Sequence, residues 1–122
     1  MRSVTLAMFG LFCSACAAWG QSPHAEDLNK ACTSASGTPG DSVCKTWVSG
    51  FYSGLAMAQV DASTNHKVPA TCLPSGSGAA STDQMRLIIQ KFMRDNPQLL
   101  NQPMEMVAFL AIQGAFPCPK SN

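Results

Sequence analysis

Four cysteines, Cys32, Cys44, Cys72 and Cys118, are the residues whose type and spacing most restrict the chemistry of this chain. They lie 12, 28 and 46 residues apart, without the paired Cys-x-x-Cys knuckles that usually hold zinc. An even number of cysteines in a small exported domain indicates two disulfides instead. Four cysteines allow three connectivities, and the spacing alone does not choose among them.

Groups suited to catalysis are few and do not cluster along the sequence. Beyond the first 20 residues the histidines are His24 and His66, and neither has a serine or cysteine nearby in the order typical of nucleophilic catalysis. No pair of carboxylates suggests acid/base catalysis, and the segment 75–78 lacks the lysine of a phosphate-binding loop. Methionines at positions 57, 85, 93, 104 and 106 suit Cu(I), but methionine is also a common core residue. We therefore predict no enzyme, no metal and no cofactor.

Residues 1–20 have the features of a secretory signal peptide. Arg2 supplies the positive charge, residues 4–12 form an apolar stretch too short to span a bilayer, and small residues follow. Cleavage after Gly20 would release residues 21–122 into the periplasm as a single domain. Cleavage near Ala17 or Ala18 is an alternative. Lipidation of Cys16 is another, although the residue three positions earlier is not the leucine of a lipoprotein signal.

The charge of the released chain excludes several classes of partner. Once Arg2 is removed with the signal, seven basic residues balance seven acidic ones. A nucleic-acid-binding domain would carry a basic patch, and this chain has none in its sequence. No stop-transfer pattern follows the signal, so we expect no membrane attachment after cleavage.

Apolar periodicity and helix-boundary residues predict an all-α domain, a small disulfide-stapled bundle of about four helices. The first helix covers residues 24–32, and the second runs from about residue 42 to residue 60 or slightly beyond. A capping box begins the third helix at Ser81, Asn96-Pro97 ends it, and Pro103 precedes a fourth helix over residues 104–114. Segments 33–41 and 62–80 are rich in glycine, proline and serine and are expected to form loops.

The order of the helices favours one pairing of the cysteines. Cys32 ends the first helix and Cys44 begins the second, so the two are neighbours if these helices form a hairpin. This arrangement favours Cys32–Cys44 and leaves Cys72–Cys118. Each bond is expected to stabilise the domain by about 2–4 kcal/mol.

The second helix is expected to be the centre of the bundle. Its apolar face consists of Cys44, Trp47, Val48, Phe51, Leu55 and Ala58. Gly50 and Gly54 lie one turn apart, and the cost of glycine in a helix suggests that another helix packs closely there. The helix over residues 104–114 is apolar on all sides, so it must be central or covered by a partner chain.

Several short motifs occur in an order that resembles the Rap/Tai family of type VI secretion immunity proteins. They are Cys44, Gly50-Phe51-Tyr52-Ser53-Gly54, Cys72-Leu73-Pro74, Asn96-Pro97 and Phe116-Pro117-Cys118. The resemblance covers about residues 28–118. One departure is the second aromatic residue in the glycine motif, where the family more often has an aliphatic one.

The resemblance implies an all-helical periplasmic protein that binds and blocks a peptidoglycan-cleaving amidase effector, in many cases as a homodimer. A protruding loop of such proteins enters the effector's active-site cleft. By position, the corresponding segment here joins the third and fourth helices, between two prolines that limit its freedom. Its effector-binding residues would be Asp95, Asn96, Gln98, Leu99, Leu100, Asn101 and Gln102.

A second hypothesis is a small periplasmic chaperone of the acid-stress type, which is also helical and disulfide-bonded. Such a chaperone would expose an apolar helix when acid loosens a dimer. His24, His66 and scattered carboxylates do not form an evident acid trigger.

Overall fold

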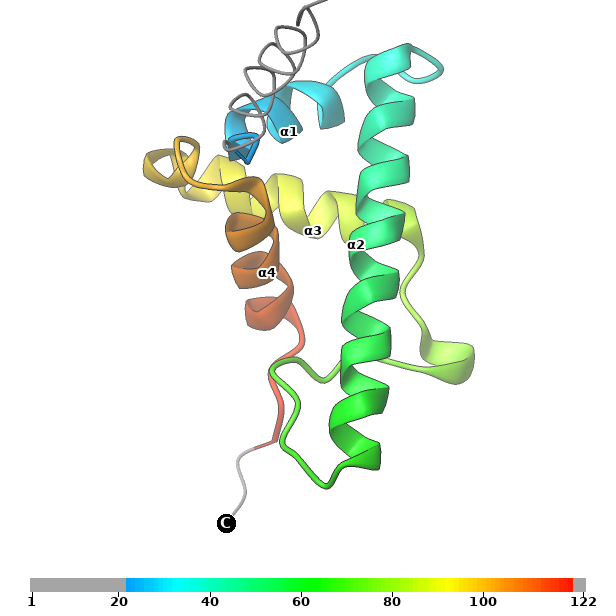
Figure 1. Ribbon diagram of the computed structural model, residues 1–122. Helices are drawn as coiled ribbons and strands as arrows, with labels where there is room; N and C mark the ends of the chain where they lie inside the picture. The colour runs from blue at the N-terminus through cyan, green and yellow to red at the C-terminus, as the bar shows by residue number, and fades with distance from the viewer. Residues whose placement is uncertain (1–21, 120–122) are drawn as a thin grey trace, which may run out of the picture.

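Four α-helices make up the fold of residues 22–119, the part of the chain that the computed structural model describes (Figure 1). They are α1 (Ala25–Cys32), α2 (Pro39–Thr64), α3 (Thr82–Asp95) and α4 (Met104–Ala115), with short 3₁₀ turns η2 (Gly76–Gly78) and η3 (Pro97–Leu99). Helices α2 and α4 stand on opposite sides of the domain, while α3 crosses between them and α1 packs near one end (Figure 1). The prediction of an all-α bundle of four helices is confirmed. The predicted signal peptide over residues 1–20 lies outside the described residues.

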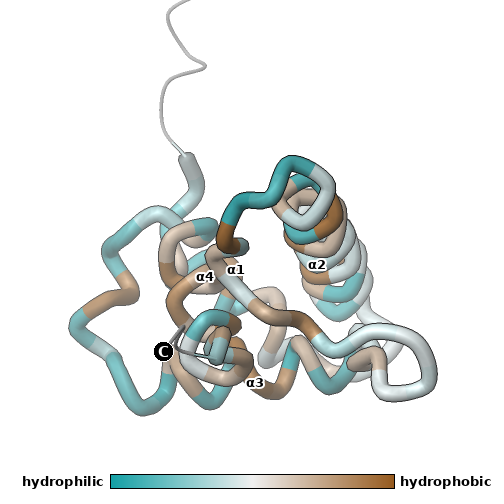
Figure 2. Tube along the Cα trace, turned by 90° about the horizontal axis from the view of Figure 1, so that it is seen from below, coloured by the Kyte–Doolittle hydropathy of each residue, from teal (hydrophilic) through white to brown (hydrophobic). Residues whose placement is uncertain are grey.

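The core forms around one face of α3. Met85, Ile89 and Met93 recur every four residues and are fully buried. They meet Val107 and Ile112 from α4 and further buried residues from the other helices. The apolar spacing of α3 therefore places this helix at the centre of the bundle. In Figure 2, hydrophilic and hydrophobic residues alternate along the helices, as expected when each helix buries one side.

Helix α2 begins earlier than the sequence predicts, at Pro39 rather than near Ser42. Thr38 has extended backbone angles, and its hydroxyl accepts a hydrogen bond from the backbone N–H of Asp41 at 3.4 Å. Thr38 is thus an N-cap, and Pro39 occupies the first helical position, where its missing N–H costs nothing. The glycine and proline in segment 33–41, taken as loop signals, belong in part to the helix start.

Helix α2 ends at Thr64, slightly beyond Val60 as predicted, and a Schellman motif ends it. The backbone N–H of His66 donates to the carbonyl of Ser63 at 3.3 Å, and that of Lys67 donates to Ala62 at 2.8 Å. His66 has a φ of 56°, in the left-handed region that glycine usually occupies at this position. A histidine here carries a conformational cost that glycine would not.

No residue in the second half of α2 is fully buried, contrary to the prediction that this helix is the centre of the bundle. Among residues 22–119, nothing lies within 4 Å of where a side chain at Gly50 or Gly54 would begin, so the predicted close approach of another helix is wrong for this part of the chain. Ala58, predicted to lie on the apolar face, is exposed. Gln59 instead holds the following segment, because its side chain accepts from the N–H of Leu73 at 2.7 Å and donates to its carbonyl at 3.3 Å.

Helix α4 buries one side rather than its whole circumference. Val107, Ala108, Ala111 and Ile112 are buried against α3 and α1, the helices that α4 mainly contacts. On the opposite side, Met106 is 41% exposed and Leu110 36% exposed. Helix α4 is therefore not enclosed by the other helices, and the alternative, cover by a partner chain, stays a prediction.

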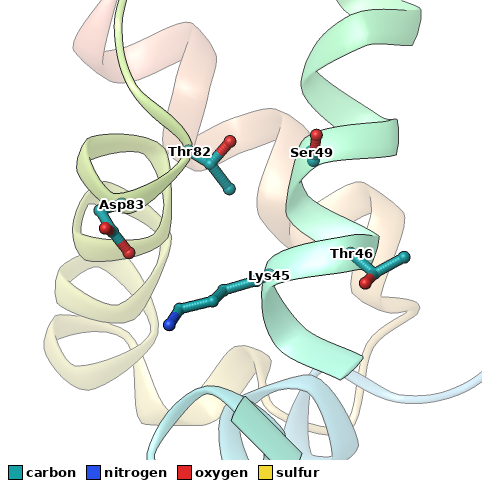
Figure 3. A pocket seen from close by; sticks show the side chains of 5 residues that line it. All are labelled: Lys45, Thr46, Ser49, Thr82 and Asp83. Carbon is teal, nitrogen blue, oxygen red and sulfur yellow. The ribbon is translucent and has the colours of Figure 1, made fainter. Parts of the chain in front are cut away.

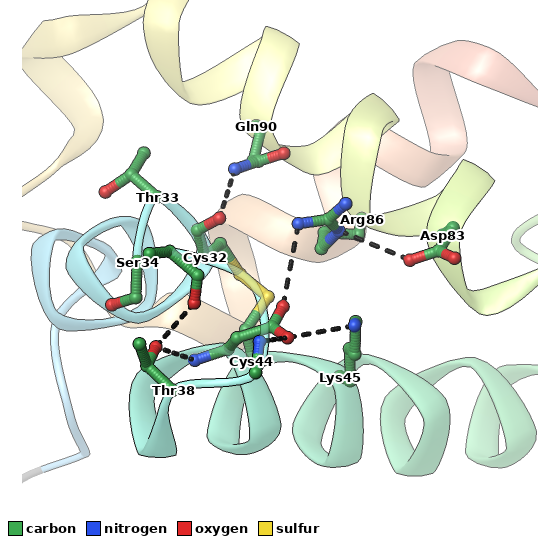
Figure 4. Close-up of polar contacts among 12 residues, drawn as sticks. Cys32, Thr33, Ser34, Thr38, Cys44, Lys45, Asp83, Arg86 and Gln90 are labelled. Carbon is green, nitrogen blue, oxygen red and sulfur yellow. Dashed lines mark hydrogen bonds and ion pairs between the residues drawn. A yellow bond between two sulfur atoms is a disulfide. The ribbon is translucent and has the colours of Figure 1, made fainter.

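Two disulfides connect parts of the chain at the helix ends and in the segments that follow them. Cys32 at the end of α1 is bonded to Cys44 in the first turns of α2, and both side chains are buried (Figure 4). Cys72 is bonded to Cys118, which ties the segment after α2 to the segment after α4. The N–H of Cys72 also donates to the carbonyl of Phe116 at 3.1 Å. This is the pairing that the helical hairpin favours.

Candidate functional site

The segment between α3 and α4 is a succession of tight turns. Asn96 ends α3, and its side-chain amide donates to the carbonyl of Phe92 at 2.9 Å. The N–H of Leu99 then donates to Asn96, that of Leu100 to Pro97 and that of Gln102 to Leu99, at 3.0 to 3.3 Å. Three successive turns leave this segment, which we call the connector loop (Asp95–Gln102), with little freedom to rearrange.

The start of α1 holds the far end of the connector loop. The N–H groups of Ala25 and Glu26 donate to the carbonyls of Gln102 and Leu100, at 2.8 and 2.9 Å. The first N–H groups of any helix have no partner within the helix, so these donors are available to a neighbouring segment. The N–H of Met104 donates back to Pro23 at 3.1 Å, and residues 24 and 103 form an isolated antiparallel bridge.

His24 adds a side-chain contact to this attachment. Its Nδ1 atom lies 2.7 Å from the carbonyl oxygen of Asn101, and because that oxygen only accepts, Nδ1 must carry the proton. The sequence marked His24 only as a candidate catalytic group. Nothing local signals this contact, because 77 residues separate the two partners along the chain.

The predicted effector-binding residues divide into two groups in the structure. Asp95, Gln98 and Asn101 are exposed, while Asn96 and Gln102 are partly buried. Leu99 and Leu100 pack against the buried core. The loop therefore presents polar side chains outward and is anchored by apolar ones.

Asp95, the first residue of the connector loop, forms an ion pair with Lys91 of α3. Lys91 donates to Asp95 one helical turn later. This hydrogen bond is the main reason that the pKa of Asp95 lies below its ordinary value. Both side chains are well exposed, so we ascribe to the pair an orienting role rather than a large stabilisation.

A second cluster of charges lies beside the Cys32–Cys44 disulfide (Figure 4). The buried carboxylate of Asp41 accepts from the backbone N–H of Gly37 at 2.9 Å and from the ammonium of Lys45 at 2.9 Å, and Arg86 lies 3.9 Å away. These partners lower the pKa of Asp41, the Gly37 hydrogen bond first. Each charged side chain of the cluster has an ion-pair partner within the fold, although the buried Nε of Arg86 makes no hydrogen bond. The pairing of Arg86 with Asp41 indicates a structural role in joining α2 to α3.

A shallow hollow next to this cluster is lined by polar side chains of α2 and α3 (Figure 3). Lys45, Thr46 and Ser49 come from α2, and Thr82 and Asp83 from α3. In Figure 3 the side chain of Lys45 extends from α2 towards α3, which carries Asp83, whereas the side chain of Thr46 points away from α3. The set contains one ammonium and one carboxylate among hydroxyl groups. This set has no histidine, cysteine or carboxylate pair to perform catalysis.

Neither a metal-binding cluster nor a membrane-spanning helix occurs in residues 22–119. Within this range no three histidine, cysteine, aspartate or glutamate residues come together in a way that would hold a metal ion. In the same range, no helix combines the length and the apolar character needed to cross a membrane.

The fold and the site thus define a small helical domain with two disulfides and a polar connector loop held by α1. The family of Rap1a immunity proteins matches residues 24–118, which is nearly the whole described part of the chain. The chain therefore belongs to the Rap1a immunity protein family, which confirms the predicted resemblance and favours an effector immunity protein over the chaperone hypothesis. Neither curated proteins nor solved structures gave a match.

Proposed function

We propose that this chain is a periplasmic immunity protein that binds a type VI secreted peptidoglycan amidase and occludes its active-site cleft. The connector loop would enter the cleft, and the protein would do no chemistry itself. The family match carries the general role of effector immunity. The amidase target and the use of this loop are the finer parts of the proposal.

The attachment of the connector loop is the observation that best supports its role. A loop that fills a cleft loses less conformational entropy on binding if its shape is already fixed in the free protein. Here the turns within the loop fix its local shape, and residues 23–26 fix its position relative to α1. The exposed carboxylate and amide groups of Asp95, Gln98 and Asn101 are suited to hydrogen bonds with polar groups in a cleft.

Export would bring the protein to the compartment where such an effector acts. We propose that residues 1–20 direct the chain to the periplasm and are removed there. Two disulfides in a domain of this size support an oxidising compartment. Mass spectrometry of the exported protein would check the cleavage after Gly20 and the absence of a lipid on Cys16.

We further propose that the protein forms a homodimer. The exposed side of α4, where Met106 and Leu110 lie, supports this because large apolar side chains on a helix are often covered in an assembly. Light scattering of the purified protein at several concentrations would measure its mass. A monomeric mass at all concentrations would contradict the proposal.

Binding and inhibition test the main proposal. Mature protein (residues 21–122) would be mixed with candidate type VI amidases, beginning with any encoded beside its gene. Expected is a stoichiometric complex by size-exclusion chromatography and loss of peptidoglycan cleavage. Replacement of Asp95–Gln102 by a Gly-Ser linker of equal length should abolish inhibition. A matched control is the substitution Lys67→Glu, at an exposed position after α2.

Two results would count against this function. If none of the amidases forms a complex with the wild-type protein, the target class is wrong. If an amidase is inhibited equally by the wild type and by the linker variant, the target is right but the connector loop does not occlude it.

A further inference from the structure

We propose that a groove beside the connector loop is a second part of the partner-binding surface and takes an acidic segment with a large apolar side chain. This inference rests on the proposed function, because it places the groove and the loop on one surface of the effector. The groove (about 500 Å³) is lined by residues of α1 and α3 and by Pro97 and Leu100 of the connector loop. A partner that contacts the loop therefore reaches the groove without a break.

The groove offers an apolar contact that the fold does not use. Leu87 lies on α3 away from the buried stripe of that helix and is 58% exposed. Met93, fully buried, and Leu100, partly buried, also line the groove. An apolar side chain seated between Leu87 and Leu100 would remove these two residues from water and contact the already buried Met93. Burial of apolar surface is the main source of affinity in an interface core.

The charge of the groove selects an acidic partner. Its lining residues include two cations, Lys91 and Arg94, and no carboxylate. Lys91 is paired with Asp95 at the rim, whereas Arg94 makes no ion pair within residues 22–119. The guanidinium of Arg94 can bind a carboxylate through two parallel hydrogen bonds. The carboxylate nearest to it in sequence, Asp95, is already held by Lys91.

Polar groups on the α1 side allow an extended segment to bind along the groove. Asn29 of α1 and Thr33, the C-cap residue of that helix, line the groove together with the cations of α3. The nearby charges on the same helix, Glu26 and Lys30, are paired with each other at 2.9 Å. The unpaired charge that faces the groove is therefore positive, which favours acidic over basic segments.

Defined peptides test the groove without any effector. Mature protein labelled with ¹⁵N and with ¹³C at leucine methyl groups would be titrated with acetyl-DLELD-amide and with acetyl-KLKLK-amide. Expected are concentration-dependent NMR shifts at Leu87, Arg94 and Leu100 with the acidic peptide only. Equal shifts with both peptides, shifts confined to other residues, or no shifts at all would overturn the inference.

Variants then test the groove against the amidase that binds the wild-type protein. Arg94→Glu should weaken binding at least tenfold and Leu87→Ser about fivefold, because each removes one of the two contacts. The matched controls Lys67→Glu and Met57→Ser introduce the same two residues at exposed positions outside the groove. Their affinity for the amidase should stay within twofold of the wild type. Circular dichroism would verify that all four variants are folded.

The outcomes separate this inference from the proposed function. If an amidase binds and Arg94→Glu is as tight as the wild type, the groove is not part of the interface, while immunity stands. If no amidase binds but the acidic peptide shifts Leu87 and Arg94, the groove is a binding site and the amidase target is wrong. If light scattering shows that the wild-type protein is a dimer and that the single substitution Leu87→Ser abolishes self-association, a second copy of this chain fills the groove and the inference fails.

Discussion

The attachment of the connector loop to α1 makes a sharp prediction about amide hydrogen exchange. The N–H groups of Ala25 and Glu26 lie in the first turn of a helix, where amides usually face water and exchange quickly. In this fold they donate to carbonyls of the connector loop instead. They should therefore be protected in the wild type and lose that protection when the loop is loosened.

The expected size of the effect follows from the hydrogen bonds that opening must break. The two backbone bonds and the His24–Asn101 bond each contribute about 1 kcal/mol, or about 3 kcal/mol together. An opening free energy of that size corresponds to a protection factor on the order of 100. Replacement of Asp95–Gln102 by a Gly-Ser linker should reduce it to less than about ten.

Two-dimensional NMR after transfer into D₂O measures these rates residue by residue. The amide of Cys32 is the internal control, because it lies in the last turn of α1 and is bonded within the helix. Its exchange should change little in the linker variant. If Ala25 and Glu26 already exchange at the unprotected rate in the wild type, the loop is not held by α1. The argument for a preformed binding loop would then be wrong.

Three further predictions concern stability. Replacing Cys32 and Cys44 together by alanine should cost about 3 kcal/mol and lower the melting temperature by roughly 10–25 °C, because the bond closes a 12-residue loop; an unchanged melting temperature would contradict this. His66→Gly should stabilise the fold by about 0.5–1 kcal/mol in urea unfolding, since φ at this position is 56°, and a loss of stability would show that the left-handed conformation carries no cost. Hydrogen bonds lower the pKa of Asp41 in the folded state. The contribution of Asp41 to folding stability is therefore fully present above the pKa of an unfolded aspartate, about 3.9, and is lost as the pH falls through the lower pKa of the folded state. Thermal unfolding between about pH 5 and pH 2 should thus depend on pH more steeply in the wild type than in Asp41→Asn, and parallel curves would refute the assignment.

Local features of the chain predict most of the helix positions. The buried stripe of α3 repeats every four residues, and its start at Ser81 is marked by a side chain that accepts from the N–H of Gln84. The order of the first two helices favours the disulfide pairing that the structure has. The sequence prediction places Pro39 in a loop and begins α2 near Ser42, although proline is favoured at the first position of a helix.

The binding surface depends on contacts that no local pattern encodes. Every residue except proline has a backbone N–H, so the sequence around Ala25 gives no sign that its donor meets the carbonyl of Gln102. The same holds for Leu87. In the sequence it is one of several apolar residues of an amphipathic helix, and only the packing of α1 beside α3 shows that it lines an open groove. Periodicity and capping act over a few neighbouring residues and can be read directly from the chain. Which helix end meets which loop is decided by how the four helices pack, because that packing brings together groups about 77 residues apart.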